Sequence, residues 1–491
     1  MNTLPATIYG GLKKRLRLFL HPYDQLFINP NTHFHFIGIG GIGMSAIAFL
    51  LKDRGYVVTG SDMKESDLTH KLQEAGIEVV VGHAEGNITQ AIDVVVVSSA
   101  IPKANPEIVA AIKSGIPIVK RSFVLGKLMQ SKKGIAVSGT HGKTTTTTMI
   151  TLILQGGGLD PSALIGGEVK NIGGNFLSGK GDTVVVEACE YDRSFLDLYP
   201  YIAVITNIEA DHLDYYRDIH EIKKAFEKFV KKIPKDGLLI IPSDDMNAVE
   251  VAKVATCKVV AFGFGGRSQM AKELFALYWE VEEVSQRKGV TTFSLSNGSK
   301  THEFSLKIPG KHNVSDACAA IIASDFLGVS MDVAGEVLKG FEGTNRRFQI
   351  KGEKKDIVVV DDYAHHPTEI RATLEGAKKF YKGKKIIAIF EPHQYSRTHM
   401  LLSEFSHSFS NADLIIIPDI YPVRDTKEDM KKVSAQDLVT AINKNGVDAL
   451  YIKDYDEIVA YLQKNIKEDS LIMTIGAGNV YKIGEMFLQS K

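Results

Sequence analysis

The segment Ser138-Gly-Thr-His-Gly-Lys-Thr-Thr145 has the residue types and spacing of a phosphate-binding loop. An apolar run precedes it, and Thr146–Leu154 follows with the pattern of a helix. In such a loop, backbone N–H groups surround the phosphates, the lysine neutralises their charge and the next hydroxyl binds Mg²⁺. We therefore predict ATP chemistry at this loop. The expected ATP-binding residues are Gly139, Thr140, His141, Gly142, Lys143, Thr144 and Thr145.

Polar residues at the ends of two later predicted strands could hold the Mg²⁺ of that ATP. Glu187 ends the run Thr183–Glu187, and His212 follows the run Ile202–Asn207. The carboxyl ends of strands in an open α/β sheet gather on the phosphate-loop side. Mg²⁺ prefers oxygen ligands, so Glu187 and the Thr144 hydroxyl are the natural candidates. A single histidine at a strand end is more often an ordinary hydrogen-bonded residue, and the residue types alone leave His212 open.

A second glycine-rich loop, Gly38-Ile-Gly-Gly-Ile-Gly43, lies near the N-terminus. The run Phe34–Ile39 leads into it and Met44–Ala48 continues as a predicted helix, which is the setting of a dinucleotide site. Asp62 ends the next predicted strand 19 residues after Gly43, where an acid can bind a ribose hydroxyl. Taken alone, this loop would indicate an NAD dehydrogenase. Its ligand is left open here, because a triphosphate loop further along the chain is foreign to that architecture.

Two polar clusters follow predicted strands in the last third of the chain, Asp361-Asp-Tyr-Ala-His-His366-Pro and Pro392-His-Gln-Tyr-Ser-Arg397-Thr. The histidine pair before proline could be a metal site, a base or a capping turn. Arg397 could hold a carboxylate through two parallel hydrogen bonds. Because both clusters lie at the binding edge of a predicted sheet, incidental surface polarity is the weaker interpretation.

The pattern along the chain predicts an α/β protein with three domains. Short β-rich runs alternate with helical patterns, which indicates parallel sheets covered by helices. The stretch 277–308 alternates instead like antiparallel strands. A chain of 491 residues is also too long for one hydrophobic core. We expect an N-terminal extension (1–31), a Rossmann-like domain (32–130), a central P-loop ATPase-like α/β domain with extra β-strands (131–345) and a C-terminal Rossmann-like domain (346–491).

Composition and charge argue against several kinds of protein. Lys+Arg and Asp+Glu both number 58, so no global field would attract nucleic acid or an anionic membrane. No run approaches the roughly 18 uninterrupted apolar residues of a membrane span. The cysteines Cys189, Cys257 and Cys318 lie far apart, which suits a reducing compartment. We therefore expect a cytoplasmic protein without nucleic-acid or membrane partners, and interpret the basic residues near the N-terminus as part of a surface extension.

The motifs taken together resemble the Mur ligases. The two glycine loops, the segment Asn207-Ile-Glu-Ala-Asp-His-Leu-Asp214 and the two C-terminal clusters occur in the order seen in that family. The resemblance covers about 34–486 and implies one domain for a UDP sugar, one for ATP and one for an amino acid. It implies that the first loop holds the UDP-linked substrate rather than NAD. The implied contacts to the UDP sugar are Gly38, Gly40, Gly41, Gly43, Ser45 and Asp62.

The resemblance also implies a reaction, being strongest to members that join L-alanine to the lactyl carboxylate of UDP-N-acetylmuramate in peptidoglycan synthesis. ATP and Mg²⁺ are the implied cofactors, an acyl phosphate is the implied intermediate, and the expected state is a monomer or weak homodimer. By the same resemblance the magnesium positions are Thr144, Glu187 and His212, the further nucleotide contacts are Asn313 and Arg347, and the amino-acid site comprises His365, His393 and Arg397. The residues expected to carry catalysis are Lys143, Glu187, His212, His365 and Arg397.

Three residues depart from the family's pattern. Cys189 replaces an acid beside Glu187, Asp316 replaces an asparagine near the adenosine, and Gln394 replaces a second arginine near the amino acid.

Other functions explain fewer of these motifs. A ligase that attaches a ready-made tripeptide to the same sugar usually differs in the first loop. An NAD oxidoreductase needs only that loop and leaves Lys143 and Glu187 unexplained. A non-catalytic nucleotide-binding regulator could lose Glu187 and Arg397, and both are present.

Overall fold

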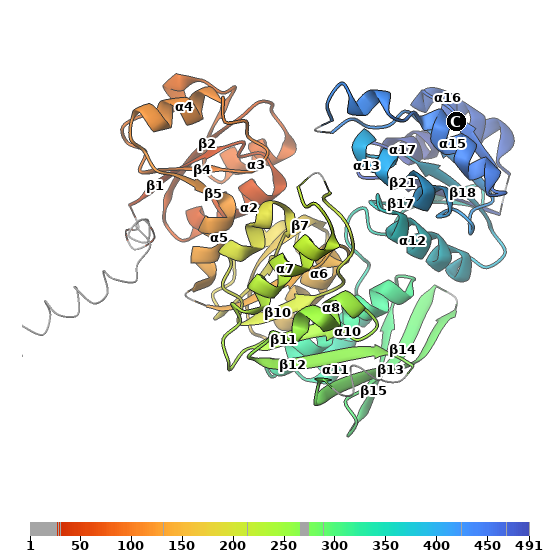
Figure 1. The fold of residues 1–491 in the computed structure, drawn as a ribbon, viewed down its shortest axis with the longest axis horizontal. Coiled ribbons are helices and arrows are strands. Elements are labelled where there is room, and N and C mark those ends of the chain that lie inside the picture. The colour runs from red at the N-terminus through yellow and green to blue at the C-terminus, as the bar shows by residue number, and fades with distance from the viewer. Residues whose placement is uncertain are drawn as a thin grey trace, which may run out of the picture. The chain divides into compact units, whose positions relative to one another are not determined.

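The structure, a computed structural model, describes residues 27, 29, 31–130, 132–213, 215–265, 274–287, 289–423, 425–467 and 469–490. Most of the expected N-terminal extension, 1–31, lies outside these residues. The chain falls into two compact units (Figure 1). The first reaches Lys133 and includes Asp197–Tyr199, and the second comprises Gly134–Leu196 and the chain from Pro200 onward.

The first unit contains, among its described residues, a five-stranded parallel sheet in the order β3-β2-β1-β4-β5. Its strands are β1 (His33–Ile37), β2 (Val57–Asp62), β3 (Glu78–Val81), β4 (Val94–Val97) and β5 (Ile118–Lys120). Its helices are α2 (Ile42–Asp53), α3 (Asp67–Glu74), α4 (Pro106–Lys113) and α5 (Arg121–Gln130), with a short 3₁₀ helix η2 (Glu85–Asn87). The strand order reverses at β1, and open sheets of this kind bind ligands where that reversal occurs.

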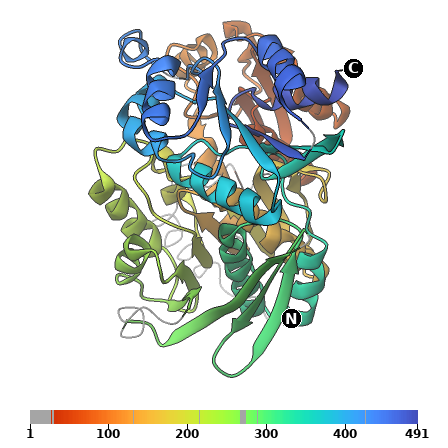
Figure 2. The ribbon, with the colours of Figure 1, turned by 90° about the vertical axis from the view of Figure 1, so that its right-hand side faces the viewer.

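The second unit begins with a mixed sheet whose described strands follow the order β15-β14-β13-β12-β11-β10-β6-β9-β7-β8. The strands are β6 (Lys133–Ser138), β7 (Ser162–Val169), β8 (Gly174–Leu177), β9 (Thr183–Glu187), β10 (Ile202–Ile205), β11 (Leu238–Pro242), β12 (Lys258–Phe264), β13 (Leu277–Arg287), β14 (Val290–Ser296) and β15 (Thr301–Leu306). The helices are α6 (Lys143–Gly156), η3 (Tyr191–Asp197), α7 (Ile219–Val230), α8 (Met246–Ala252), α10 (Lys311–Phe326) and α11 (Met331–Lys339). The antiparallel strands predicted over 277–308 are confirmed as β13–β15, which form one edge of the sheet (Figure 2). The strands β7, β8 and β12 were not predicted.

The last part of the second unit carries a six-stranded sheet in the order β16-β17-β21-β18-β19-β20. Its strands are β16 (Gln349–Lys354), β17 (Ile357–Asp362), β18 (Lys385–Phe390), β19 (Leu414–Ile417), β20 (Ala449–Tyr451) and β21 (Ser470–Ile475). Its helices are α12 (Pro367–Phe380), α13 (Tyr395–Met400), α14 (Leu402–Ser406), η4 (Asp429–Lys431), α15 (Ala435–Lys444), α16 (Tyr455–Asn465) and α17 (Tyr481–Gln489). Buried clusters cover both faces of this sheet, and the edge strand β16 is antiparallel to β17. The predicted three-domain α/β architecture is therefore confirmed.

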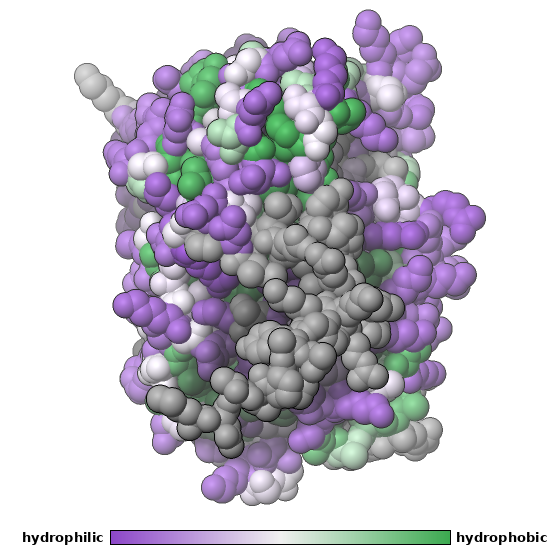
Figure 3. Space-filling model, turned by 90° about the vertical axis from the view of Figure 1, so that its left-hand side faces the viewer, coloured by the Kyte–Doolittle hydropathy of each residue, from purple (hydrophilic) through white to green (hydrophobic). Residues whose placement is uncertain are grey.

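The surface agrees with the balanced composition. On the face drawn in Figure 3, hydrophilic residues predominate and hydrophobic ones form small patches between them. Among the described residues, no helix is both long and apolar enough to cross a membrane.

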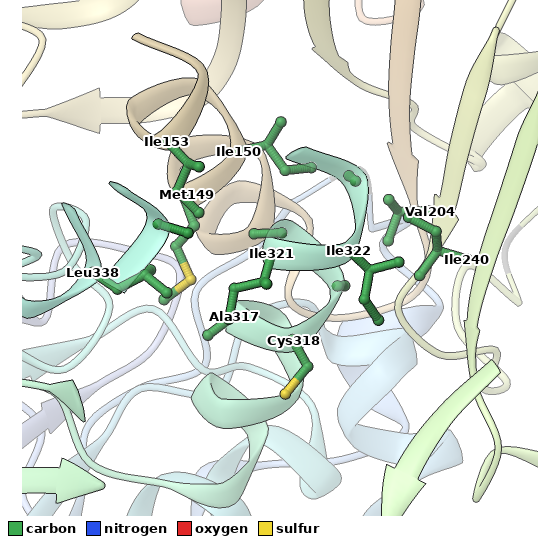
Figure 4. Packing of buried hydrophobic residues seen from close by; sticks show 14 of the residues in the cluster. Met149, Ile150, Ile153, Val204, Ile240, Ala317, Cys318, Ile321, Ile322 and Leu338 are labelled. Carbon is green, nitrogen blue, oxygen red and sulfur yellow. The ribbon is translucent and has the colours of Figure 1, made fainter. Parts of the chain in front are cut away.

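The core of the central domain fixes the helix that carries the phosphate loop. Helix α10 packs along α6, and Ile321 of α10 is fully buried. Figure 4 shows side chains of α6, α10 and α11 converging with Val204 of β10 and Ile240 of β11. Because α6 begins at the phosphate loop, this apolar packing sets where the loop's N–H groups point.

We predict that Ile321→Ala destabilises the second unit by roughly 2–5 kcal/mol, because it removes buried methylene groups and leaves a cavity. Urea unfolding followed by fluorescence and circular dichroism measures the change. The matched control is Ile112→Ala on α4, where the side chain is 66% exposed and the expected change stays within about 0.5 kcal/mol. Equal effects of the two substitutions would contradict this account of the core.

Candidate active site

The phosphate loop connects β6 to α6, and two of its glycines have positive φ angles that other residues reach only with strain. Gly139 has a φ of 137° and Gly142 a φ of 81°. A Cβ atom would lie 2.1 Å from the Thr206 hydroxyl at Gly139, and 2.4 Å from an Asp316 carboxylate oxygen at Gly142. The two residues after Gly139 donate their N–H groups to the carbonyl and the side-chain oxygen of Asn207, at 3.1 and 2.9 Å. Neighbouring strands thus hold the loop in one conformation.

Lys143, the first residue of α6, turns its ammonium group back over the loop. Its Nζ donates to the carbonyls of Gly139 and Thr140, the latter at 3.0 Å, and lies 3.2 Å from the Glu190 carboxylate. Burial would lower the pKa of Lys143, but the nearby negative groups, Glu190 first among them, together outweigh burial and raise the pKa. The loop therefore carries a fixed positive charge, as phosphate binding requires.

Glu190 is a buried acid that sequence reasoning did not assign to the site. Its Oε1 lies 3.5 Å from His212 Nε2. Burial would raise the pKa of Glu190, but Lys143 and His212 lower it, so the carboxylate stays ionised. The signal was available, because Glu190 follows Glu187 by three residues in the same strand-end segment.

Thr144 and Glu187 offer oxygen donors that suit Mg²⁺, and His212 adds the imidazole that the resemblance implies. Glu187 accepts the N–H of Gly166 in β7, and a Cβ atom at Gly167 would lie 3.5 Å from Thr144 Cγ2, so both side chains approach the same pair of glycines. His212 Nδ1 is buried and has no hydrogen-bond partner among the described residues. One carboxylate and one hydroxyl are sufficient protein ligands for a magnesium ion that also binds phosphates and water.

A cavity of about 530 Å³ opens beside the phosphate loop. Its walls come from that loop, the ends of β10 and β11, the start of α10 and helix α12. The expected nucleotide contacts Asn313 and Arg347 both line it. Arg347 lies 3.5 Å from Glu369, and its guanidinium carbon is 5.1 Å from the Tyr363 ring centre. Cavities of this size hold ligands such as nucleotides.

Asp316 lies directly behind the loop. It accepts a hydrogen bond from the Thr146 hydroxyl at 3.0 Å, and burial raises its pKa to about 7. Asp316, one of the departures from the family's pattern, therefore lies close behind Gly142 and also lines the cavity.

His141 joins the phosphate loop to the C-terminal domain. Its Nδ1 is 3.0 Å from a Glu369 oxygen and its Nε2 is 3.4 Å from a Glu209 oxygen. Burial would lower the pKa of His141, but Glu369 and Glu209 raise it to about 9. Thr368 donates to Glu209 at 2.8 Å. From the sequence, the strand-end segment that contains Glu209 was expected near ATP, without a role for Glu209 itself. Glu369 was missed, although it stands where a helix after His366-Pro367 places its capping acid.

Arg397 of α13 reaches the segment that follows β10. Its Nη2 is 3.3 Å from Asp211 Oδ1, and the two side chains are only 9% and 10% exposed. Burial would raise the pKa of Asp211, but His212 and Arg397 hold it well below its usual range. A small cavity at this pair is lined by Asp211, His212, Leu213, Gln394, Arg397 and Met400, among others.

His365 and His393 lie close together, with ring centres 6.3 Å apart. Burial lowers the pKa of His365 to about 3, with Arg397 adding to the effect against the opposing charge of Glu369. His365 is therefore neutral at physiological pH. His393 stacks on Tyr421, with ring centres 5.6 Å apart. The structure thus brings together the expected residues of the phosphate, nucleotide and amino-acid sites at adjoining edges of two sheets.

The first glycine loop lies in the other unit and is held by Asp62. The Asp62 carboxylate accepts the Gly40 N–H at 2.9 Å, and a Cβ atom at Gly40 would lie 2.9 Å from Thr69 Cγ2 and 3.0 Å from Asp62 Oδ2. Gly38 has a φ of 79°, and Gly41 caps α2. Asp62 therefore shapes the loop in addition to any ribose contact.

Two further side chains complete this loop. A Cβ atom at Gly43 would lie 1.7 Å from an Arg121 guanidinium nitrogen, so a cation that sequence reasoning missed lies against the loop. Arg121 follows β5, a strand that was not predicted. The Ser45 hydroxyl is buried and donates to the Ile42 carbonyl at 3.0 Å.

Comparison with family models gives the same domain order. The description "Mur ligase family, catalytic domain" matches 33–133, "Mur ligase middle domain" matches 137–324, and "Mur ligase, glutamate ligase domain" matches 346–478.

Known proteins match over nearly the whole chain. A UDP-N-acetylmuramate–L-alanine ligase of Caldanaerobacter subterraneus is 47% identical and covers 93% of this chain and 97% of its own length. A ligase of that name from Acetivibrio thermocellus is 44% identical, with 95% and 98% covered. The solved UDP-N-acetylmuramate–alanine ligase of Thermotoga maritima superposes with a TM-score of 0.78 at 29% identity, covering 94% of this chain and 99% of its own. The chain belongs to the Mur ligase family.

Proposed function

We propose that this chain joins L-alanine to the lactyl carboxylate of UDP-N-acetylmuramate, with hydrolysis of ATP to ADP and phosphate. The observation that carries the proposal is that the phosphate loop after β6, Glu187 at the end of β9 and the Arg397–Asp211 pair after β10 all lie at the carboxyl ends of neighbouring strands. An amino-acid ligase needs a loop for phosphoryl transfer beside a site that binds a zwitterion. A buried pair of opposite charges suits a zwitterion. The names of the relatives support the same substrates.

The proposed chemistry begins with attack of the sugar's carboxylate on the terminal phosphorus of ATP, which breaks the bond to ADP and forms an acyl phosphate. Lys143 would neutralise the transferring group, so catalysis is mainly positioning and electrostatics. Magnesium, held by Thr144, Glu187 and His212, would offset the phosphate charge. L-alanine then loses its ammonium proton to solvent, its neutral amine attacks the acyl carbon, phosphate leaves, and the departing phosphate takes the second proton from the nitrogen. Residues of α12 around the cavity would exclude water from the intermediate.

The amino acid would be held by opposite charges at its two ends. In our proposal Arg397 binds the α-carboxylate and Asp211 receives the ammonium group, so that the zwitterion inserts between the two. Gln394, in place of a second arginine, leaves Arg397 with most of the carboxylate interaction. His365, neutral at physiological pH, would accept a hydrogen bond there rather than carry charge.

In this proposal each of the three domains binds one of the three substrates. We assign the UDP sugar to 32–130, ATP to 131–345 and L-alanine to 346–491, and place the reaction in the cytoplasm. The test is ADP release by the purified full chain with UDP-N-acetylmuramate, comparing L-alanine with the ready-made tripeptide that the rival ligase would attach to the same sugar. Faster turnover with the tripeptide would overturn the proposal.

Lys143→Ala should reduce ADP formation by at least about 100-fold, because one such electrostatic contact to a transition state is worth that much. Steady-state turnover at saturating substrates measures it, and thermal unfolding checks that the protein remains folded. The control is Lys339→Ala, which removes an exposed lysine paired with Glu336. Retention of a tenth or more of wild-type turnover by a folded Lys143→Ala protein would contradict the assignment.

Arg397→Lys should raise the KM for L-alanine roughly 30-fold or more with little change in the KM for ATP. The lysine ammonium group cannot form the two parallel hydrogen bonds of a guanidinium, and losing a buried charged hydrogen bond costs about 2–5 kcal/mol. Asp211→Asn should act in the same direction. Arg217→Lys, at a side chain that is 84% exposed, is the matched control. If only the ATP constant moves, Arg397 belongs to the phosphates and the alanine site lies elsewhere.

Gly40→Ala should weaken UDP-N-acetylmuramate binding much more than ATP binding, because the added methyl group would press on Thr69 and Asp62 and alter the first loop. Calorimetric titration of each ligand measures the two affinities. Gly86→Ala is the control in the same unit, since its Cβ atom would meet nothing within 4 Å. Arg121→Met, which leaves the loop backbone intact, should show the same selectivity. Selective loss of ATP affinity in both variants would refute the assignment.

A further inference from the structure

Three side chains from different elements converge beside the nucleotide cavity without an assigned role as a group. His141 comes from the phosphate loop, Glu209 from the segment after β10, and His366 from the residue that caps α12. One ligand atom from each lies within 4.8 Å of the others. Two imidazoles and a carboxylate are the donor set of many zinc sites.

The distances within this group suit a metal better than direct hydrogen bonds. Glu209 Oε2 is 3.4 Å from His141 Nε2 and 3.6 Å from His366 Nδ1. Direct N–H···O bonds cluster at about 2.9–3.0 Å. With Zn–N and Zn–O bonds of roughly 2.0–2.2 Å, two ligands of a tetrahedral zinc lie about 3.4 Å apart. Both separations to Glu209 are therefore close to tetrahedral edges, and metal binding would draw the two imidazoles somewhat closer together.

The surroundings of the two histidines support the same interpretation. The Glu369 carboxylate faces His141 Nδ1 at 3.0 Å, which would keep a proton on Nδ1 while a bound metal displaces the proton of Nε2. This carboxylate–histidine arrangement is the usual support of a metal-binding imidazole. His366 is 6% exposed, and its Nδ1, the nitrogen that faces Glu209, accepts the Thr368 N–H at 3.4 Å. A metal bound to Nδ1 would replace this long capping contact, while Nε2 has no hydrogen-bond partner among the described residues. The Glu209 backbone is fixed by its N–H, which donates to Thr140 Oγ1 at 2.9 Å.

We propose that His141, Glu209 and His366 form a binding site for a zinc-like transition-metal dication, separate from the magnesium position at Thr144, Glu187 and His212. A metal bound there would link the phosphate loop to the start of α12, and so tie the central domain to the C-terminal domain. Nitrogen ligands select such a metal over Mg²⁺.

Cobalt absorption tests the site without relying on activity. The full-length protein, free of nucleotide and in excess Mg²⁺, is titrated with Co²⁺, whose intense visible bands report tetrahedral coordination. Wild type should show these bands and lose them when Zn²⁺ is added. Glu369→Gln, which removes the support of His141, should weaken binding roughly 10- to 100-fold. Glu209→Gln and His366→Gln, which remove ligands, should weaken it more. The control, His407→Gln, removes an exposed histidine that contacts Ser403 and should bind as wild type does.

Three results would overturn the proposal. Absence of tetrahedral bands in wild type would show that the group is only a network of charges around His141. Equal affinity in the His366→Gln and His407→Gln proteins would place the metal elsewhere. Sulfur-to-cobalt bands in the near ultraviolet would place it on a cysteine. None of these results bears on the ligase reaction, so the two proposals fail independently.

Discussion

A buried carboxylate between two potential cations governs the arrangement of the phosphate site. Glu190 is nearly inaccessible, and an ionised carboxylate in such a position is strongly unfavourable unless it is paired. Lys143 and His212 provide the pairing from two different segments. The same contacts direct the Lys143 ammonium over the phosphate loop and bring the segment after β10 against it. The contacts that neutralise this one buried charge thus hold the residues around the phosphate loop in place.

Contacts of opposite charge also connect the central and C-terminal domains. His141 faces Glu369, and Arg397 faces Asp211, while the Thr368 hydroxyl donates to Glu209. Buried pairs of this kind contribute little net stability compared with apolar packing, but they fix geometry because a misplaced partner leaves a charge uncompensated. Glu209 lines the nucleotide cavity and Asp211 lines the proposed alanine site, so the segment after β10 forms part of both. A charged group of a ligand could replace the protein's own partner of either acid.

Two residues expected to contact ligands also shape the glycine loops, and one residue beside the first loop was missed. Asp62, expected at a ribose, holds the Gly40 N–H and so shapes its own loop. Asp316, expected near the adenosine, also supports the back of Gly142 through contacts that no motif encodes. Arg121 follows a short strand, β5, whose three residues give too little periodicity to be predicted, and the cation beside the first loop was missed for that reason.

The sequence by itself determined the α/β architecture, the antiparallel strands near 277–308 and the position of both glycine loops. It could do so because glycine spacing, strand periodicity and helix signals are local properties of the chain. It also identified Lys143, Glu187 and Arg397 as candidates, because phosphate, metal and carboxylate binding call for a lysine, an acid and a guanidinium. Only the tertiary structure decided that Glu190 pairs with Lys143, Asp211 with Arg397, and both Glu209 and Glu369 with His141. Those contacts join segments far apart in the chain, and the charge that each acid must neutralise becomes visible only when the sheets and helices have packed.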